Sequence, residues 1–377
     1  MALMRPGKPW LRTVACVTMA STLLLVGWFG PGRTWAAAPA RSANAGMVFH
    51  LPAGTFTLNP RIAARIKNHQ PLRAIMSFQA LGVPFAYPEL TSGMKTAFQQ
   101  VKKTYGRTMT GKVVGPTQTD PNAQISQIHT LLASGQVDCL GIEPVTPQGF
   151  ANIFAEAWKD GVPVFSVNTD APKAKRISYY GLNELAGGKL AGQYTVNFLR
   201  SHGVKTLTAA HMETGDTTAP WAQERMAGWE SVVKAAWPNV KIDDTPTSAP
   251  SDNYAPQAVY SATKAYLTGH PQTQFIFHTD WGGESIGKVI KDLNLMGKVY
   301  TLGYNADDGI LNEIQSKQII GTVDQRYDLQ SGGYVKGCAS MLFANKAPKF
   351  NSFVTPYIVT PQNVVAYRNF FHKLIHP

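Results

Sequence analysis

Short apolar runs alternate with longer amphipathic segments along most of this chain, and this alternation constrains the fold more than any other feature. The first pair comprises residues 72–78 (LRAIMSF) and residues 88–106, where a helical pattern ends at Gly106. The pairs continue to an apolar run at residues 319–325 (IIGTVDQ). Strands that alternate with helices of this length form βαβ units. The chain is therefore predicted to be an α/β protein with parallel sheets.

The length of the chain predicts two such sheets. With 377 residues, of which 44% are hydrophobic, the chain exceeds what a single compact domain is expected to hold. The strand–helix pattern restarts after Asp170, with residues 177–183 (ISYYGLN) as its first strand. We therefore expect two consecutive open sheets, with the first boundary near Asp170.

The first 46 residues have the organisation of an export signal. Three basic residues precede an apolar stretch at residues 14–30, and small residues follow it. This order is typical of a secretory signal peptide, predicted here at residues 1–36, with cleavage between Ala36 and Ala45. An uncleaved membrane anchor is the alternative, because the apolar stretch is just long enough to span a bilayer.

Charge and cysteine content narrow the range of partners. Removal of residues 1–36 takes away four basic residues and no acid, so the net charge falls from +12 to +8. The remaining Lys and Arg residues are scattered, so no nucleic-acid partner is expected. The sequence has no CxxC pair, His-rich cluster or phosphate-binding glycine motif, and no cofactor or metal is predicted. An exported protein could form a disulfide between Cys139 and Cys338. Alternatively, Cys139 is a small hydrophobic residue buried in an apolar strand.

Polar and aromatic residues gather where the predicted strands end. In open parallel sheets, ligands bind beyond the carboxyl ends of the strands. The segment GVPVFSVNTD at residues 161–170 ends an apolar strand with Asn168 and Thr169, and similar groups follow other strands. Amide and carboxyl groups can pair with ligand hydroxyls, while aromatic rings cover apolar ligand faces. The strand ends therefore predict a small-molecule cleft. Its candidate residues are Phe85, Tyr87, Asn168, Thr169, Trp221, Asp280, Trp281, Asn305 and Gln325.

Several of these residues also have a structural interpretation. Asn168 could simply end a strand, and Asn305 could form a turn, because Asn tolerates left-handed backbone geometry. The two tryptophans could be packing residues, and Phe85 and Tyr87 could fix the start of the first helix.

Five segments, in the same order and context, resemble those of type I periplasmic sugar-binding proteins of the ribose-binding kind. They are GVPVFSVNTD, GLNELAGGKLAG, WAQERMAGW, GYNADDGIL and GTVDQ, and the resemblance extends over about residues 72–360. It implies two doubly wound parallel-sheet lobes with the ligand held between them. Three hinge crossovers are expected at residues 168–170, 324–326 and 355–357. The implied division is residues 37–71 as an N-terminal extension, 72–169 with 327–355 as the first lobe, and 170–326 with 356–377 as the second lobe.

The chain departs from the ribose-binding proteins where the resemblance places ligand contacts. Those proteins carry Asp-Arg where this chain has Asn168 and Thr169. They carry Arg, Asn and Asp where this chain has Gln223, Thr279 and Asn305, respectively. A pocket poorer in fixed charges predicts a neutral ligand with more apolar surface, such as another sugar, a polyol or a small signalling molecule.

Gln325 and Arg225 match the ribose-binding pattern, although the role of Arg225 could be structural. The leading hypothesis is a periplasmic, non-enzymatic receptor that delivers a small polar ligand to the membrane permease of an ABC importer. A related alternative is a receptor for a chemoreceptor or a sensor kinase, since an N-terminal extension also occurs in autoinducer-binding relatives. An alternative from a different class is an exported hydrolase that uses acids such as Glu143, Asp170 or Asp280. No nucleophile-elbow motif supports it.

Overall fold

The computed structural model of the chain describes residues 47–144, 146, 149–243 and 255–376. The predicted signal peptide at residues 1–36 lies outside them. Within the described ranges, none of the helices is both long enough and apolar enough to cross a membrane.

The first sheet contains six parallel strands. They are β3 (Leu72–Ser77), β4 (Met109–Val114), β5 (Cys139–Ile142), β6 (Val164–Asn168), β7 (Tyr179–Gly181) and β13 (Asn351–Phe353). Their order across the sheet is β13-β7-β6-β5-β3-β4. Every residue of β5 and β6 is buried, as expected for central strands of a parallel sheet with both faces covered.

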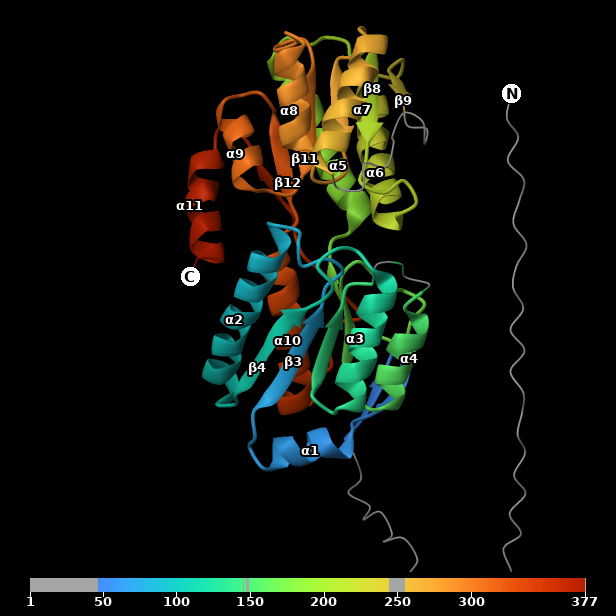
Figure 1. Cartoon of the computed structure of the whole chain (residues 1–377), viewed down its shortest axis with the longest axis vertical. Helices are drawn as coiled ribbons and strands as arrows, with labels where there is room; N and C mark the ends of the chain where they lie inside the picture. Colours follow the sequence, from blue (N-terminus) through green and yellow to red (C-terminus); the bar gives the residue numbers. More distant parts are fainter. Residues whose placement is uncertain (1–46, 145, 147–148, 244–254, 377) are drawn as a thin grey trace, which may run out of the picture. The chain divides into compact units, whose positions relative to one another are not determined.

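Four of the described helices belong with this sheet, and their ends follow from their sequences. They are α2 (Ala86–Tyr105), α3 (Pro121–Ala133), α4 (Ala151–Lys159) and α10 (Tyr327–Ala344). At the start of α3, Asp120 accepts a hydrogen bond from the backbone N–H of Ala123, and Pro121 occupies the first turn. Gly106 ends α2 in the left-handed conformation, with a φ of 62°. Helix α2 lies beside α10, and α3 lies beside α4 (Figure 1).

The second sheet also has six strands. They are β8 (Ala209–Glu213), β9 (Lys241–Asp243), β10 (Phe275–His278), β11 (Tyr300–Tyr304), β12 (Gly321–Asp324) and β14 (Tyr357–Val359). Their order is β14-β12-β11-β10-β8-β9, and only β14 is antiparallel to its neighbour. The prediction of an α/β protein with two open parallel sheets is confirmed, and β9 is a short edge strand that the sequence analysis missed.

The helices of the second sheet pack in pairs. They are α5 (Glu184–Ser201), α6 (Pro220–Ala236), α7 (Pro256–Gly269), α8 (Gly283–Asp292), α9 (Asp308–Gln315) and α11 (Val364–Ile375). Helix α5 lies beside α6, α7 beside α8, and α9 beside α11 (Figure 1). Helix α11 is the last helix of the described chain and follows β14.

The chain leaves the first sheet after β7, and not at Asp170. Strand β7 pairs with β6, so that Asn168 lies opposite Gly181. The prediction that residues 168–170 form the first crossover, and that the second lobe begins at Asp170, is therefore wrong. The polar segment after β6 has the composition of a boundary, but a three-residue strand follows it and pairs back with the first sheet.

The chain passes between the sheets twice more. After β12 it enters α10, whose Tyr334 packs against Phe165 of β6 with ring centroids 6.1 Å apart. It leaves the first sheet again between β13 and β14, and β14 pairs with β12 of the second sheet. That the two sheets and their helices move as separate lobes stays a prediction.

The N-terminal extension folds into a hairpin and a short helix. Strands β1 (Val48–Leu51) and β2 (Gly54–Thr57) pair antiparallel, and α1 (Pro60–Lys67) follows them. The ring of Phe56, from β2, is fully buried and contacts Trp158 of α4 edge-on, with centroids 5.1 Å apart. Burial would raise the pKa of Asp138, but hydrogen bonds from Arg73 and from Arg61 of α1 lower it below its ordinary value. Apolar packing and ion pairing therefore both attach the extension to the elements of the first sheet.

A disulfide ties α10 to the first sheet. It joins Cys139 of β5 to Cys338 of α10, whose Cα atoms are 6.5 Å apart and which are separated by 199 residues in the sequence. Both cysteines are fully buried. The disulfide that the sequence left open is therefore formed, and it fixes the helix that returns from the second sheet.

Reduction of this disulfide is expected to lower the free energy of unfolding by about 2–5 kcal/mol, because a cross-link between distant residues restricts the unfolded chain. Urea unfolding with and without dithiothreitol measures the change. The double variant C139A/C338A is the control, since its stability should match that of the reduced protein and should not respond to the reductant. An unchanged urea midpoint after complete reduction would contradict this expectation.

Candidate functional site

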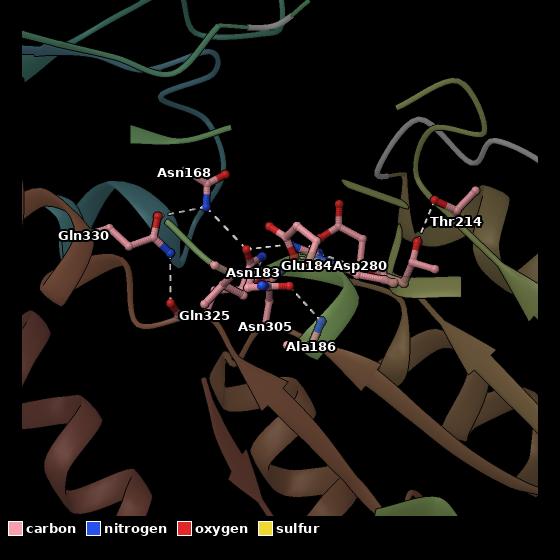
Figure 2. A network of polar contacts seen from close by, with 12 residues as sticks. Asn168, Asn183, Glu184, Ala186, Thr214, Asp280, Asn305, Gln325 and Gln330 are labelled. Atoms are coloured by element: carbon pink, nitrogen blue, oxygen red, sulfur yellow. Dashed lines mark hydrogen bonds and ion pairs between the residues drawn. The ribbon is translucent and has the colours of Figure 1, made fainter. Parts of the chain in front are cut away.

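Side chains from the carboxyl ends of both sheets meet in one buried network (Figure 2). The amide nitrogen of Asn168, at the end of β6, donates to Oε1 of Gln325 at 3.3 Å and to Oε1 of Gln330 at 3.1 Å. Nε2 of Gln325, just after β12, donates to Oδ1 of Asn305 at 2.7 Å, and Nδ2 of Asn305 donates to Oδ1 of Asp280. The fold therefore brings four candidate residues together and adds Gln330, which the sequence analysis missed.

The two asparagines of this network have a left-handed backbone. The φ angle is 63° at Asn168 and 66° at Asn305, and Asn is one of the few residues that tolerate this region. Each asparagine therefore ends or follows a strand with a sharp change of direction. The backbone of Asn305 turns, as the turn interpretation expects, and its side chain joins the network. Its contact with a ligand stays a prediction.

Arg225 of α6 connects the network to two further elements. It is 2% exposed, and its Nη2 donates to Oε1 of Gln325 at 2.7 Å. Its Nε donates to Oε2 of Glu184, at the start of α5, at 2.7 Å, and its Nη1 donates to the backbone oxygen of Thr279 at 2.9 Å. Burial would lower the pKa of Arg225, but the carboxylate of Glu184 raises it above the ordinary value, so the guanidinium stays charged. Arg225 thus links the start of α5, the backbone after β10 and Gln325 through three hydrogen bonds.

Close packing of α5 on α6 places Arg225 beside Glu184. A side-chain carbon at Gly188 of α5 would lie 2.2 Å from the backbone oxygen of Arg225, and one at Gly228 of α6 would lie 2.3 Å from that of Leu185. Only glycine allows the two backbones to approach this closely. Gly188 of the GLNELAGGKLAG segment and Gly228 of the WAQERMAGW segment therefore determine the position of the buried ion pair.

The side chains of three other candidate residues lie outside this network. Gln223 is exposed, and its Nε2 donates to the backbone oxygen of Thr217 at 3.2 Å. Tyr87, in the first turn of α2, is 39% exposed. Thr279 is buried, and its hydroxyl donates to Oγ1 of Thr214 at 2.6 Å (Figure 2). The polar groups of Gln223 and Thr279 are thus engaged within the elements of the second sheet.

Aromatic rings from both sides of the site pack against one another. Phe85, just before α2, is buried, and its ring centroid lies 5.7 Å from that of Trp281, which follows β10. The same ring lies 6.0 Å from Tyr327 at the start of α10. The indole N–H of Trp281 donates to Oδ2 of Asp307, which fixes the orientation of the indole. These rings form an apolar wall that could cover one face of a ligand.

A cavity of about 760 Å³ borders the network at Asn168. Thr169 and Trp221, both candidate residues, also line it. Its size is typical of small-molecule pockets. The sequence analysis did not place the rest of its wall at the site. These residues come from the segment after β6, from β7 and the start of α5, and from β13, and β7 and β13 are strands of only three residues. These additional lining residues include Asp170, Tyr179, Leu182, Asn183, Glu184, Asn351 and Phe353.

Metal chemistry finds no support in the described part of the chain. No group of three or more His, Cys, Asp or Glu side chains within it is arranged to hold a metal ion. The site consists instead of amides, carboxyl groups and aromatic rings, which can bind a polar organic molecule.

The fold is that of periplasmic binding proteins. The family described as the periplasmic binding protein domain matches residues 81–342, and the chain belongs to this family. The chain is 25% identical over 218 residues to the ribose import binding protein RbsB of Haemophilus influenzae. This alignment covers 58% of this chain and 70% of that protein. Identity to the RbsB protein of Escherichia coli is 24% over 218 residues, or 57% of this chain and 69% of the relative.

Solved structures of sugar-binding proteins share the fold. GanP, a glucose-galactose binding protein from Geobacillus stearothermophilus, has a TM-score of 0.66 and 19% identity, and the match covers 78% of this chain and 99% of GanP. An ABC transporter solute-binding protein from Burkholderia graminis, in complex with D-arabinose, has a TM-score of 0.68 and 22% identity, with coverage of 78% and 97%. At these identities the likeness concerns the fold alone.

Substitution of Arg225 by alanine is expected to lower the free energy of unfolding by about 3–5 kcal/mol, because Glu184 would keep a buried charge without its partner. Gln223→Ala, two positions earlier on the same helix, removes an exposed side chain and should change it by no more than about 0.5 kcal/mol. Urea unfolding of both variants makes the comparison. Equal effects of the two substitutions would contradict the structural role of Arg225.

Proposed function

We propose that this protein is an exported receptor that captures a small, neutral, polyhydroxylated molecule and delivers it to the permease of an ABC importer. The observation that carries the proposal is the convergence of Asn168, Asn305 and Gln325 on one buried network beside a cavity. Strand ends of both sheets contribute, so a ligand bound there would contact both. Because amides both donate and accept hydrogen bonds, they match hydroxyl groups, which do the same.

The proposed ligand class draws on the composition of the site and on the relatives. Amides stand at Asn168 and Asn305, and the aromatic wall of Phe85 and Trp281 suits the apolar face of a sugar ring. The named relatives are ribose import binding proteins, and the similar solved structures include one with bound D-arabinose and one with bound D-allose. A sugar or polyol is the ligand that fits both lines of argument, and no catalytic step is needed for this function.

Transport requires that the receptor change shape when the ligand binds. The chain passes between the two sheets through short segments that follow β7, β12 and β13. A few residues in such segments can absorb the backbone rotations of hinge closure. A ligand that contacts both sides favours the closed state through its differential affinity, so the permease can distinguish loaded from empty receptor by shape.

A sensory role is the second candidate. One similar solved structure is the XylFII-LytSN complex, with a TM-score of 0.64 and 17% identity. The match covers 78% of this chain and 98% of the chain in that structure. The hairpin and α1 add a surface next to the elements of the first sheet. A sensor protein could read the ligand-bound form through this surface instead of a permease.

A panel of D-ribose, D-arabinose, D-allose, D-galactose, D-glucose and xylitol is expected to include at least one ligand. A ligand at about one hundred times its dissociation constant adds about 2.7 kcal/mol to the free energy of unfolding. Asn168→Ala should weaken binding by about 1–3 kcal/mol, because it leaves buried polar partners unpaired. Thermal-shift screening followed by calorimetry measures both effects.

Gln193→Ala is the matched control for this binding experiment. Gln193 is exposed on α5, and among the described residues its amide bonds only to Asn197. Its substitution should leave the affinity unchanged. If no member of the panel stabilised the protein, the proposed function would be wrong.

Export is proposed from the basic, apolar and small-residue order of the first 46 residues and from the periplasmic relatives. The mature protein is expected to begin between residues 37 and 46. Mass spectrometry of the intact protein from an exporting host measures this directly. A membrane-bound product that retains Arg5 would favour the uncleaved anchor instead.

A further inference from the structure

The cavity beside Asn168 is lined by large apolar side chains that remain exposed. Phe353, at the end of β13, is 53% exposed, and Leu185, in the first turn of α5, is 39% exposed. Trp221, in the first turn of α6, is half-buried and lines the same cavity. Exposed apolar side chains that gather on one surface are typical of a binding site. These three side chains, here called the apolar wall, have no role in the amide network.

The apolar wall and the amide network are adjacent through β7. Asn168 of β6 and Phe353 of β13 both lie opposite Gly181 of β7, one on each side. Because neighbouring strands are about 4.8 Å apart, the backbones of these two residues are about 10 Å apart. The hydroxyl of Tyr179 donates to the backbone oxygen of Asn168 at 2.6 Å, and its ring meets that of Phe353 edge-on, with centroids 6.1 Å apart. A ligand with two joined rings can therefore reach both.

Arg176, which does not itself line the cavity, holds two of its walls together. Its side chain is 1% exposed, and its Nη2 donates to Oδ2 of Asp170 at 2.8 Å and to Oδ1 of Asn351 at 2.8 Å. Its guanidinium also lies over the ring of Phe350, 4.1 Å from the centroid. Asp170 follows β6 and Asn351 begins β13, so both segments are fixed before a ligand binds. Their polar groups are satisfied within the protein.

The polar groups of α5 that line the cavity also have partners. Oδ1 of Asn183 caps the helix by accepting a hydrogen bond from the backbone N–H of Ala186 at 3.0 Å. Glu184 is paired with Arg225. The other polar lining residues that are at least partly open to water are Thr169, Lys173 and Glu224. Most of the polar lining is therefore bonded within the protein or solvated, while the apolar wall has no cover.

The side-chain oxygen of Asn168 is the polar atom of the network that stays available at the cavity. The amide nitrogen donates to Gln325 and Gln330, and the oxygen points away from them (Figure 2). No described residue donates a hydrogen bond to this oxygen. A buried amide oxygen without a donor is unfavourable, and a ligand hydroxyl can supply the missing hydrogen bond.

We propose that the ligand is a glycoside, a sugar that carries an aromatic or other apolar substituent. A sugar hydroxyl donates to the side-chain oxygen of Asn168, and the substituent lies against Trp221, Leu185 and Phe353. Burial of apolar surface favours binding in proportion to the area removed from water, so the apolar wall adds affinity only for a ligand with such a surface. This inference rests on the proposed function and narrows its ligand class.

The test compares methyl and phenyl glycosides of D-ribose, D-arabinose, D-allose, D-galactose and D-glucose, in both anomeric forms, by calorimetry. Within each pair the sugar is the same and only the substituent differs. At least one phenyl glycoside should bind at least about tenfold more tightly than its methyl counterpart, because its ring covers the apolar wall. Lactose and cellobiose carry a second sugar in place of the phenyl ring of the galactoside and the glucoside, and they should lack this gain.

Leu185→Ala and Phe353→Ala each remove part of the apolar wall and should lower the preference for the phenyl glycoside by about 3- to 10-fold. The readout is the ratio of phenyl to methyl affinity, which a general loss of stability would not change. Leu190→Ala is the matched control, because Leu190 is also 39% exposed and also on α5 but does not line the cavity. It should leave the ratio unchanged. Circular dichroism and thermal melting establish that each variant is folded.

Each other outcome has a definite meaning. If sugars or methyl glycosides bind and no phenyl glycoside binds more tightly, the inference is wrong and the receptor function stands. A disaccharide that binds as tightly as the matching phenyl glycoside would also overturn the apolar assignment, as would an unchanged ratio in both folded wall variants. Failure of the wild-type protein to bind any of these probes or a free sugar would overturn the proposed function, and the inference with it.

Discussion

The guanidinium of Arg225 is the contact on which the arrangement of the site depends. It joins the start of α5 through Glu184, the end of β10 through the backbone of Thr279, and the passage after β12 through Gln325. A buried arginine is stable only when each of its donors finds an acceptor. Because these acceptors come from three elements, the charge of one side chain determines how those elements meet. Gln325 then passes this constraint on to the amide network.

The interior of the site has a charge balance that differs from that of the chain. The whole sequence has a net charge of +12, yet the groups at the strand ends are amides and carboxyls. Asn168, Asn305 and Gln325 are linked through Gln325, and the guanidinium of Arg225 and the carboxyl group of Asp280 complete the network. Asp280 adds a carboxyl group from the second sheet, which accepts a hydrogen bond from Asn305. Amides both donate and accept hydrogen bonds, so they match the hydroxyl groups of the proposed ligand.

The path of the chain gives the first sheet contributions from three separate parts of the sequence. Residues up to β7 form most of it, α10 returns after β12, and β13 adds the edge strand. The disulfide between Cys139 and Cys338 makes the return of α10 covalent. The hairpin and α1 are held by Phe56 and by the arginines around Asp138. This anchoring leaves the short passages between the sheets as the segments best placed to move.

The sequence by itself determined the α/β class, most strands and helices, and the strand ends where polar groups gather. These features depend on local patterns, such as the cap formed by Asp120 and the stop at Gly106, which neighbouring residues encode. Only the tertiary structure decided that β7 belongs to the first sheet, that Cys139 pairs with Cys338, and that Arg225 and Gln330 join the amide network. Each of these depends on which distant segments meet. A three-residue strand or a single buried side chain carries too little local pattern to specify its partner.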